Sequence, residues 1–545
     1  KHYTDGDQIY RVYNEGYFDG EKQSYAVTTT PLAETLLKEY PEIIQSARIA
    51  PDLDEAGTNL VRTVQESLNN YEEGFLYVDP SFLKMFQFNM IHGDLTALER
   101  PFTIVLTASK AARFFPGENP LGKSLILNNN TERAFEVTGV IKDLPNNTHL
   151  NFDYLLSMQG VENAQVPNWK FGNFVTYIKV AEHTNIKDLE SKMVDVIKQY
   201  KDPDYEESVA AGQHVWYRLQ PIKDIHLKSA HIFGYWTHGN IQYVWLFGLI
   251  ALFILLIASI NFMNLSTARS ANRAKEIGLR KVLGSQRGQL TNQFLVESIL
   301  ITVLAFSLAI VLSWILLPNF NQLTGSTLSI PWSNIWMYPM LLIGILGIGL
   351  LSGIYPSFFL SSFRPMQTLQ GQLKSGKKGA GFRSALVVFQ FTISIVLIVG
   401  SLVVKKQLDY IQSKQLGFDK EQVIILEDTY TINDQRASFK EELNQIIGIE
   451  SVSFSSFIPV SGYQRNGTGA WLTGTNPEET GVNLAKWYVD YDYVKTLGLN
   501  ILEGRDFSVD RKNDARQAII LNQRAVEMLG LRDPIGKQMT SQTFL

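Results

Sequence analysis

The residues that could do chemistry most directly are Gly117–Ser124, because GENPLGKS matches the phosphate-binding pattern G-x-x-x-x-G-K-S. In such a loop the backbone N–H groups cradle phosphates, and a helix begins directly afterwards. Here the next residues, Leu125–Asn130, are typical of a strand that runs into a turn. A related segment, Gly530–Gln538, keeps Pro-x-Gly-Lys but has one more residue between its glycines and no Ser or Thr after the lysine. We therefore interpret the motif as a turn before a strand and not as a nucleotide site.

No other group of residues has the spacing of a catalytic or metal site. The eight histidines include no H-E-x-x-H, and His226 with His231 or His238 is better explained by solvated or packed side chains than by zinc. The chain has no cysteine, which excludes thiol catalysis and disulfides. A net charge of −4 does not favour nucleic acid as a partner. We expect a non-enzymatic protein with no cofactor and no metal.

Four stretches free of charged residues are long enough to cross a hydrocarbon core of about 30 Å as helices, namely residues 244–265, 298–317, 335–360 and 384–404. The loops between them differ in charge. Residues 318–334 contain no Lys or Arg, whereas residues 361–383 contain five and no acid. Since basic loops stay in the cytoplasm, the first of these loops should lie outside and the second inside.

The connection between the first two spans is the most basic segment of the chain. Its single acid, Glu276, stands against six cations, which are Arg269, Arg273, Lys275, Arg280, Lys281 and Arg287. The spacing predicts a short amphipathic cytoplasmic helix over residues 268–284. We expect an i,i+4 pair between Glu276 and Arg280 and Gly284 in the C′ position. One side of this helix should carry Ala271, Ala274, Ile277 or Gly278, and Val282. Composition alone leaves two interpretations, a helix lying among lipid head groups or a helix that docks on a protein.

The run Arg273–Gly284 (RAKEIGLRKVLG), followed by Gln293–Ser298 (QFLVES), resembles the signature of the MacB/FtsX-type permeases of ATP-binding-cassette systems. In that family the segment between the second and third membrane helices is a coupling helix that docks on the ATPase. The resemblance implies a permease in the bacterial inner membrane, which transmits ATPase-driven motion to periplasmic domains for export or extraction of a substrate. It implies that the contact with the ATPase uses Glu276, Gly278, Arg280, Lys281 and Gly284.

The resemblance leaves other points open. An alternative is an FtsX-like signalling subunit that regulates a cell-envelope enzyme without transport. Lipoprotein extraction would require an apolar cleft near residues 215–245. Besides the cytoplasmic ATPase and membrane lipid, a periplasmic or outer-membrane partner fits the family, as does either a dimer of permease units or one duplicated chain.

The fold class expected is a multi-domain membrane protein, with an α-helical transmembrane bundle and α+β extracytoplasmic domains. We expect an outer domain at 1–240, a permease domain with three spans at 241–384, a fourth helix at 384–404 and a second outer domain at 405–545. In the first outer domain, a helix should cover 31–40 with Thr30 as its N-cap, and another should cover 186–200. We expect that domain to consist of a layer built from 1–75 and 170–235 and an inserted β-rich piece at 76–165.

The two outer segments resemble each other. Val78-Asp79 matches Val489-Asp490, Gly93 matches Gly504, and Pro120–Lys123 matches Pro534–Lys537, always 411 to 414 residues apart. Several matches in one order at one offset indicate duplicated units. The repeat predicts a longer chain, with a membrane helix before residue 1 and three more after residue 545.

Three features of the spans bear on helix packing. Gly349 and Gly353 form a small-xxx-small pattern, which is typical of closely packed helices and, as a second interpretation, of a dimer interface. Glu297 should face the bundle or the interface, where it could pair with the basic segment. Asn261 and Asn264 are expected to form hydrogen bonds between helices.

Overall fold

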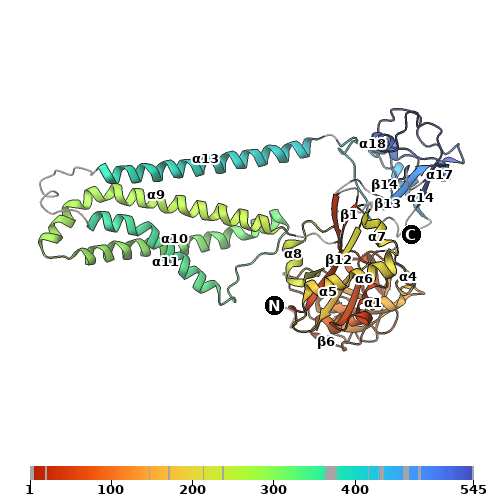
Figure 1. The fold of residues 1–545 in the computed structure, drawn as a ribbon, viewed down its shortest axis with the longest axis horizontal. Helices are drawn as coiled ribbons and strands as arrows, with labels where there is room; N and C mark the ends of the chain where they lie inside the picture. Colours follow the sequence, from red (N-terminus) through yellow and green to blue (C-terminus); the bar gives the residue numbers. More distant parts are fainter. Residues whose placement is uncertain are drawn as a thin grey trace. The chain divides into compact units, whose positions relative to one another are not determined.

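A computed structural model describes residues 5–542 except for 19–20, 54, 146–147, 170–171, 211, 213, 236–238, 362–376, 415, 428, 430–431, 433–434, 458, 460–465 and 477–479. The chain divides into two compact units (Figure 1). One unit comprises residues 1–240 and 415–545, and the other comprises residues 241–414.

The first outer segment is built on one mixed sheet, with strand order β10-β7-β9-β8-β4-β5-β3-β11-β1-β12, while β2 pairs with β1 and β6 with β9. The pairs β10–β5 and β7–β9 are parallel and the other pairs are antiparallel, which agrees with the α+β expectation. The strands are β1 Ile9–Phe18, β2 Glu21–Tyr25, β3 Ile43–Ala50, β4 Gly57–Thr63, β5 Asn70–Val78, β6 Met90–His92, β7 Thr103–Thr107, β8 Ser124–Leu127, β9 Ala134–Ile141, β10 Tyr154–Ser157, β11 Val175–Val180 and β12 His214–Pro221.

The predicted division of this domain at residue 75 is wrong. Strand β4 pairs with β8, and β5 pairs with β10, so the sheet crosses the expected boundary twice. Strands β3, β11, β1 and β12 join this part of the sheet through the pairing of β3 with β5, in which Ile49 lies opposite Val78. Side-chain periodicity shows which residues are buried but does not specify which distant strand they pair with, and the division depended on that information.

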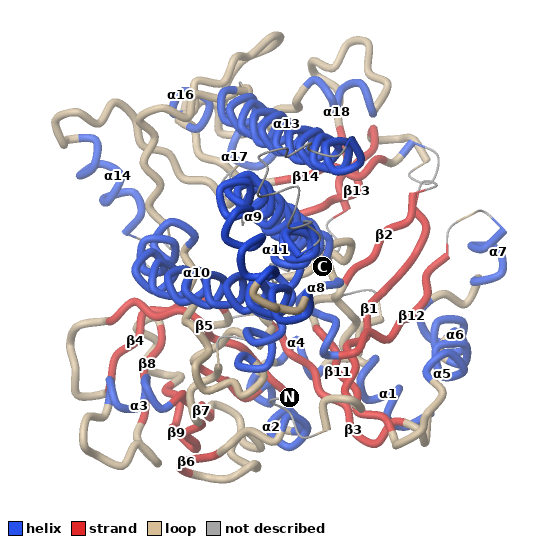
Figure 2. The backbone as a smooth tube through the Cα atoms, turned by 90° about the vertical axis from the view of Figure 1, so that its left-hand side faces the viewer, coloured by secondary structure: helices blue, strands red, loops and turns tan. Residues whose placement is uncertain are grey.

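The helices cover both faces of the sheet, with α1 against β3, α2 against β3, and α3 against β7 and β9 (Figure 2). They are α1 Leu32–Glu39, α2 Ser81–Phe86, α3 Ala108–Phe114, α4 Glu162–Gln165, α5 Ile186–Lys192, α6 Val194–Val196, α7 Tyr205–Ala210 and α8 Ile225–Lys228.

Two details of the predicted helices are corrected. The helix expected at 31–40 is α1, but Pro31 and not Thr30 stands at its N-cap, and no side chain caps it. The helix expected at 186–200 is divided into α5 and α6, and a wide π turn at Ile197–Lys201 follows them. In this stretch Leu189, Val196 and Ile197 are all buried.

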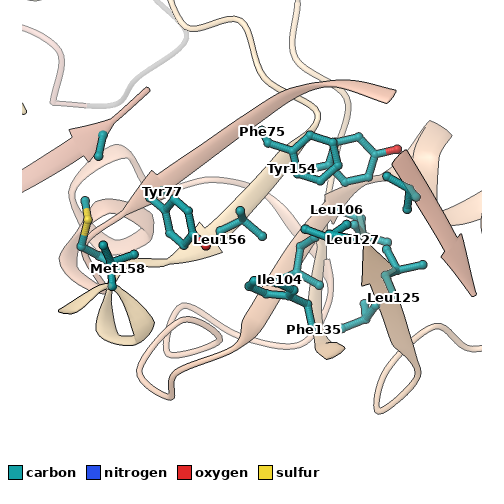
Figure 3. Packing of buried hydrophobic residues seen from close by; sticks show 14 of the residues in the cluster. Phe75, Tyr77, Ile104, Leu106, Leu125, Leu127, Phe135, Tyr154, Leu156 and Met158 are labelled. Carbon is teal, nitrogen blue, oxygen red and sulfur yellow. The ribbon is translucent and has the colours of Figure 1, made fainter. Parts of the chain in front are cut away.

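Strand β5 carries the packing of both faces. Phe75 and Tyr77 belong to one buried cluster, and Leu76 and Val78 to another, as expected for side chains that alternate across a strand. Figure 3 shows the first cluster, in which residues of β5, β7, β8, β9 and β10 meet. Because helices α3 and α2 contribute to the two clusters, the centre of the sheet is buried on both sides.

The Gly117–Ser124 motif is a turn, as predicted. Gly122 has a positive φ of 78°, Lys123 N–H donates to the Pro120 carbonyl (3.2 Å), and strand β8 begins at Ser124. The related turn in the second outer segment has the same form. Gly536 has φ 75°, Lys537 N–H donates to the Pro534 carbonyl (3.4 Å), and strand β15, Met539–Gln542, follows.

The second outer segment repeats part of the first. Its sheet has the order β14-β13-β15, with β13 Asn466–Leu472 and β14 Val482–Lys486, and both pairs are antiparallel like β5-β4-β8. Asp79 and Asp490 also make the same bonds. The backbone N–H groups of Asp79 and Asp490 donate to the carbonyls of Arg48 and Phe454, both at 3.0 Å, and each carboxylate accepts from the N–H of that residue. The two segments thus share these strand pairings and hydrogen bonds, which is what the predicted repeat requires. Its helices are α14 Arg436–Asn444, α16 Tyr493–Thr496, α17 Asp514–Gln517 and α18 Gln523–Met528.

The second unit contains the long helices α9 Ile241–Val282, α10 Arg287–Thr324, α11 Met337–Ser361 and α13 Lys377–Ser413, which Figure 1 shows. Among the described residues, four segments are long and apolar enough to cross a membrane, namely residues 241–267, 287–324, 337–358 and 384–413. Each overlaps the corresponding charge-free stretch of the sequence.

The glycines of the small-xxx-small pattern bring α11 against α10. A Cβ on Gly349 would lie 3.0 Å from Ile299 Cγ1, and a Cβ on Gly353 would lie 2.9 Å from Ser298 Cβ. Helices can approach this closely only where one of them has no side chain. The close-packing interpretation is therefore confirmed within the chain.

Substitution of Gly353 by leucine is expected to force α10 and α11 apart and to cost about 1–3 kcal/mol, the usual range for overpacking. We expect a lower midpoint in thermal unfolding of the detergent-solubilised chain. Gly347→Leu is the matched control on the same helix, because a Cβ there meets nothing within 4 Å. Equal destabilisation by both variants would show that the effect arises from the new leucine and not from the contact with α10.

Candidate functional site

The basic connection between the first two long helices is a compact hinge. Helix α9 ends at Val282, where Gly284 has a positive φ of 99°. Gly284 N–H donates to the Lys281 carbonyl (3.2 Å) and Ser285 N–H to the Arg280 carbonyl (3.0 Å), which is the Schellman pattern of a helix end. Gly284 therefore occupies the predicted C′ position. Helix α10 starts directly afterwards, with Gln286 and Gln289 forming a reciprocal cap.

The predicted short helix at 268–284 is not a separate element. It continues the membrane helix, because α9 runs without a break from Ile241 to Val282. The sequence has no proline in this range, and Gly278 alone does not end the helix. The side chains of residues 268–275 and Gly278, including Arg269, Ala271, Arg273, Ala274 and Lys275, lie outside the described part of the chain.

Two residues predicted to lie on the same side of the helix, Ile277 and Val282, differ in burial. Ile277 is 2% exposed and forms a small cluster with Leu290 and Phe294 of α10. Val282, which was placed on the same side, is 60% exposed. Val282 lies in the last turn of α9, just before the chain turns back into α10.

An ion pair lies beside this cluster. Arg280 Nη2 is 2.7 Å from Glu276 Oε1, which confirms the predicted i,i+4 pair, and Arg280 Nη1 donates to Gln293 Oε1 at 3.0 Å. These side chains line a cavity of about 110 Å³, which Glu297 also lines. The hinge thus brings together the two separated parts of the sequence motif, residues 273–284 and 293–298.

The tip of the hinge is exposed and of mixed character. Leu279, Val282 and Leu283 are 54%, 60% and 78% exposed. The side chains of Glu276 and Arg280 are 56% and 44% exposed. Burial and the nearby Arg287 charge lower the pKa of the Lys281 ammonium. Sequence reasoning missed Leu279 and Leu283, although their i, i+4 spacing outside the charge-free stretch was a signal. Such a surface can bind a protein partner through apolar contact and charge.

Two other regions weighed in the sequence analysis, the histidines near residue 230 and the segment 215–245, are only partly described. His238 lies outside the described residues, and His226 packs against Gly239, where a Cβ would lie 3.2 Å from His226 Nε2. Among the described residues, no group of three or more His, Asp or Glu side chains could hold a metal ion. In the region named for an apolar cleft, residues 236–238 are also outside the description, and Phe233 packs on Tyr25 with ring centroids 5.7 Å apart.

Comparison with known proteins finds one matching family model in each of the two units. The family model of the MacB-like periplasmic core domain matches residues 1–196, and that of the FtsX-like permease C-terminal domain matches residues 248–365. The macrolide export ATP-binding/permease protein MacB of Neisseria meningitidis is 24% identical over 64% of this chain and 50% of its own length. MacB of Aggregatibacter actinomycetemcomitans is 24% identical over 56% of this chain and 44% of its own. The chain spans about half the length of these curated relatives.

Solved structures include similar outer domains. A domain of a putative permease from Porphyromonas gingivalis has a TM-score of 0.36 and 23% identity over 41% of this chain and 92% of that chain. The periplasmic region of MacB from Actinobacillus actinomycetemcomitans has a TM-score of 0.28 and 16% identity over 40% of this chain and 91% of that chain. Together the two family models match more than half of the 545 residues. With four apolar helices in the part of the chain that the structure describes, the chain therefore belongs to the MacB/FtsX-type permeases, multi-pass proteins of the inner membrane with periplasmic core domains.

Proposed function

We propose that this chain is the permease subunit of an ABC transporter. A separate cytoplasmic ATPase binds its hinge, and the contact uses Glu276, Gly278, Arg280, Lys281 and Gly284. The observation that supports this most is the exposed tip of α9, where apolar and charged side chains stand together outside the apolar span 241–267. In this proposal 1–240 and 405–545 are outer domains, 241–384 is the permease domain and 384–404 is the helix that opens the second copy.

The continuity of α9 supports transmission of motion. One helix extends from the hinge at Val282 to Ile241, directly after the first outer segment. An α-helix has an internal hydrogen bond at almost every residue, so a displacement of one end is carried to the other. A second long helix, α13, likewise extends beyond the predicted span 384–404, from Lys377 to Ser413.

The motion would serve export or extraction of a substrate. The names of the curated relatives, macrolide export proteins, favour export over the alternative of a signalling subunit that regulates a cell-envelope enzyme. Both functions would receive the motion at the same hinge. A periplasmic or outer-membrane partner and a second permease unit belong to the same proposal.

Charge reversal at the hinge tests the contact with the ATPase. Glu276→Lys and Arg280→Glu are each expected to weaken binding of the ATPase at least about thirtyfold, and so to lower the amount that co-purifies, since loss of an interfacial charge pair costs roughly 2–5 kcal/mol. The double variant Glu276→Arg/Arg280→Glu keeps the ion pair within the helix but reverses the charges offered to the partner. We expect it to bind no better than the single variants.

Arg524→Glu is the control, because Arg524 forms an exposed ion pair, with Glu527, on α18 of the second outer segment. It should co-purify with the ATPase as the unmodified chain does. Retained binding together with undiminished ATP hydrolysis in all hinge variants would remove the hinge as the coupling site.

A further inference from the structure

At the end of α10 opposite the hinge, the helix and the loop that follows it border an open cavity of about 310 Å³. The helix wall consists of Trp314, Leu317, Pro318 and Asn321, which are spaced i, i+3, i+4 and i+7 and so share one face. Leu328, Ile330 and Trp332 of the loop form the facing wall.

Hydrogen bonds within the protein hold the loop wall in place. Asn321 Oδ1 accepts from Leu328 N–H (3.1 Å), and Asn321 Nδ2 donates to the Leu328 carbonyl (2.8 Å). At the other end of the loop, the Tyr338 hydroxyl donates to the Trp332 carbonyl (3.0 Å). The two walls are therefore fixed by contacts independent of any occupant.

The helix wall also contains a backbone acceptor. Pro318 lies inside α10 and has no N–H, so the helical hydrogen bond from residue 318 to the Trp314 carbonyl cannot form. Within a membrane a backbone carbonyl without its helical partner costs free energy unless another donor reaches it. The exposed residue Ser329 adds a hydroxyl to the lining.

The uncharged surroundings of the cavity indicate an apolar occupant. Residues 314–321 belong to an apolar span, and the sequence has no charged residue between Glu297 and Arg364. Two tryptophans on a lining with no charged residue are typical of the membrane interface, where rings contact lipid chains and polar atoms face head groups.

The geometry points to a binding site for one phospholipid of the outer leaflet. Its acyl chain lies between Trp314 and Trp332, and donors of its head group reach the Trp314 carbonyl and the Ser329 hydroxyl. Phosphatidylethanolamine is the suitable probe, because its ammonium group donates hydrogen bonds.

The test is native mass spectrometry of the full chain, released from nanodiscs that contain phosphatidylethanolamine. Trp332→Ala removes one wall, and Leu317→Trp fills the cavity with a larger side chain. We expect each variant to retain the tightly bound lipid at least about fivefold less than the unmodified chain, because a lost or blocked aromatic contact costs roughly 1 kcal/mol or more.

Trp336→Ala is the matched control, since Trp336 is 71% exposed near the same loop but does not line the cavity. It should retain the lipid fully. Equal retention in all four proteins would show that the lipid belongs to the general annulus and would overturn the site. A dimer of the chain that disappears in Trp332→Ala and Leu317→Trp would overturn it as well, because a second copy would then be the occupant.

Discussion

Replacement of Phe75 by alanine is expected to destabilise the first outer domain by about 3–5 kcal/mol, the range for a large aromatic residue lost from a core. Phe75 is fully buried on β5, and its ring stacks on that of Tyr154 in β10 with centroids 4.0 Å apart and an interplanar angle of 2° (Figure 3). Since β5 and β10 are paired in parallel at these two residues, a cavity there lies between strands that join distant parts of the sequence.

The loss can be measured by pulse proteolysis of the full chain in detergent over a urea gradient, followed with an antibody against the outer domain. Leu68→Ala is the control, because Leu68 is 80% exposed in the loop between β4 and β5 and should change stability by less than about 0.5 kcal/mol. A loss below about 1 kcal/mol for Phe75→Ala would contradict the packing described for this cluster.

The membrane spans could be predicted because the signal is local. A run of about 20 apolar residues without charge is typical of a membrane helix. Each predicted run lies in or overlaps a long apolar helix of the structure. The hinge ion pair and Gly284 followed from equally local rules, the i,i+4 spacing and the need for a positive φ after a helix end.

The features that sequence reasoning missed depend on contacts between distant residues. The pairing of β4 with β8, which removed the predicted boundary at residue 75, depends on a register that alternation within one strand does not specify. The exposure of Val282 depends on where α10 turns back, and not on the helical position of Val282 itself. The repeat could be proposed from the sequence because two similar segments of one chain allow a non-local comparison that a single segment does not.

Replacement of Glu72 by alanine is expected to cost about 3 kcal/mol, the lower end of the range for breaking a buried ion pair, since Arg113 loses this partner while Lys110 keeps its ion pair with Asp153. The Glu72 side chain is 1% exposed, and its oxygens lie 2.5 Å from Lys110 Nζ, 2.5 Å from Arg113 Nη1 and 2.9 Å from the Tyr154 hydroxyl. Burial and this hydrogen bond both raise the pKa of Tyr154. Although burial opposes the charge of Lys110, the bond to Glu72 and the charge of Asp153 raise the Lys110 pKa.

The neighbouring Glu73 supplies the control, because it is exposed on the same strand and Glu73→Ala should be nearly neutral under the same urea gradient. The variant Glu72→Gln distinguishes the effect of the negative charge from that of the side chain's shape, because glutamine is nearly the same shape but neutral. It keeps an acceptor for Tyr154 but removes the negative charge between Lys110 and Arg113, so we expect an intermediate loss. If Glu72→Gln were as stable as the unmodified chain, the carboxylate would act only as a hydrogen-bond acceptor. If it lost as much as alanine, the charge would account for the full effect, and α3 would be held on the sheet mainly by electrostatics.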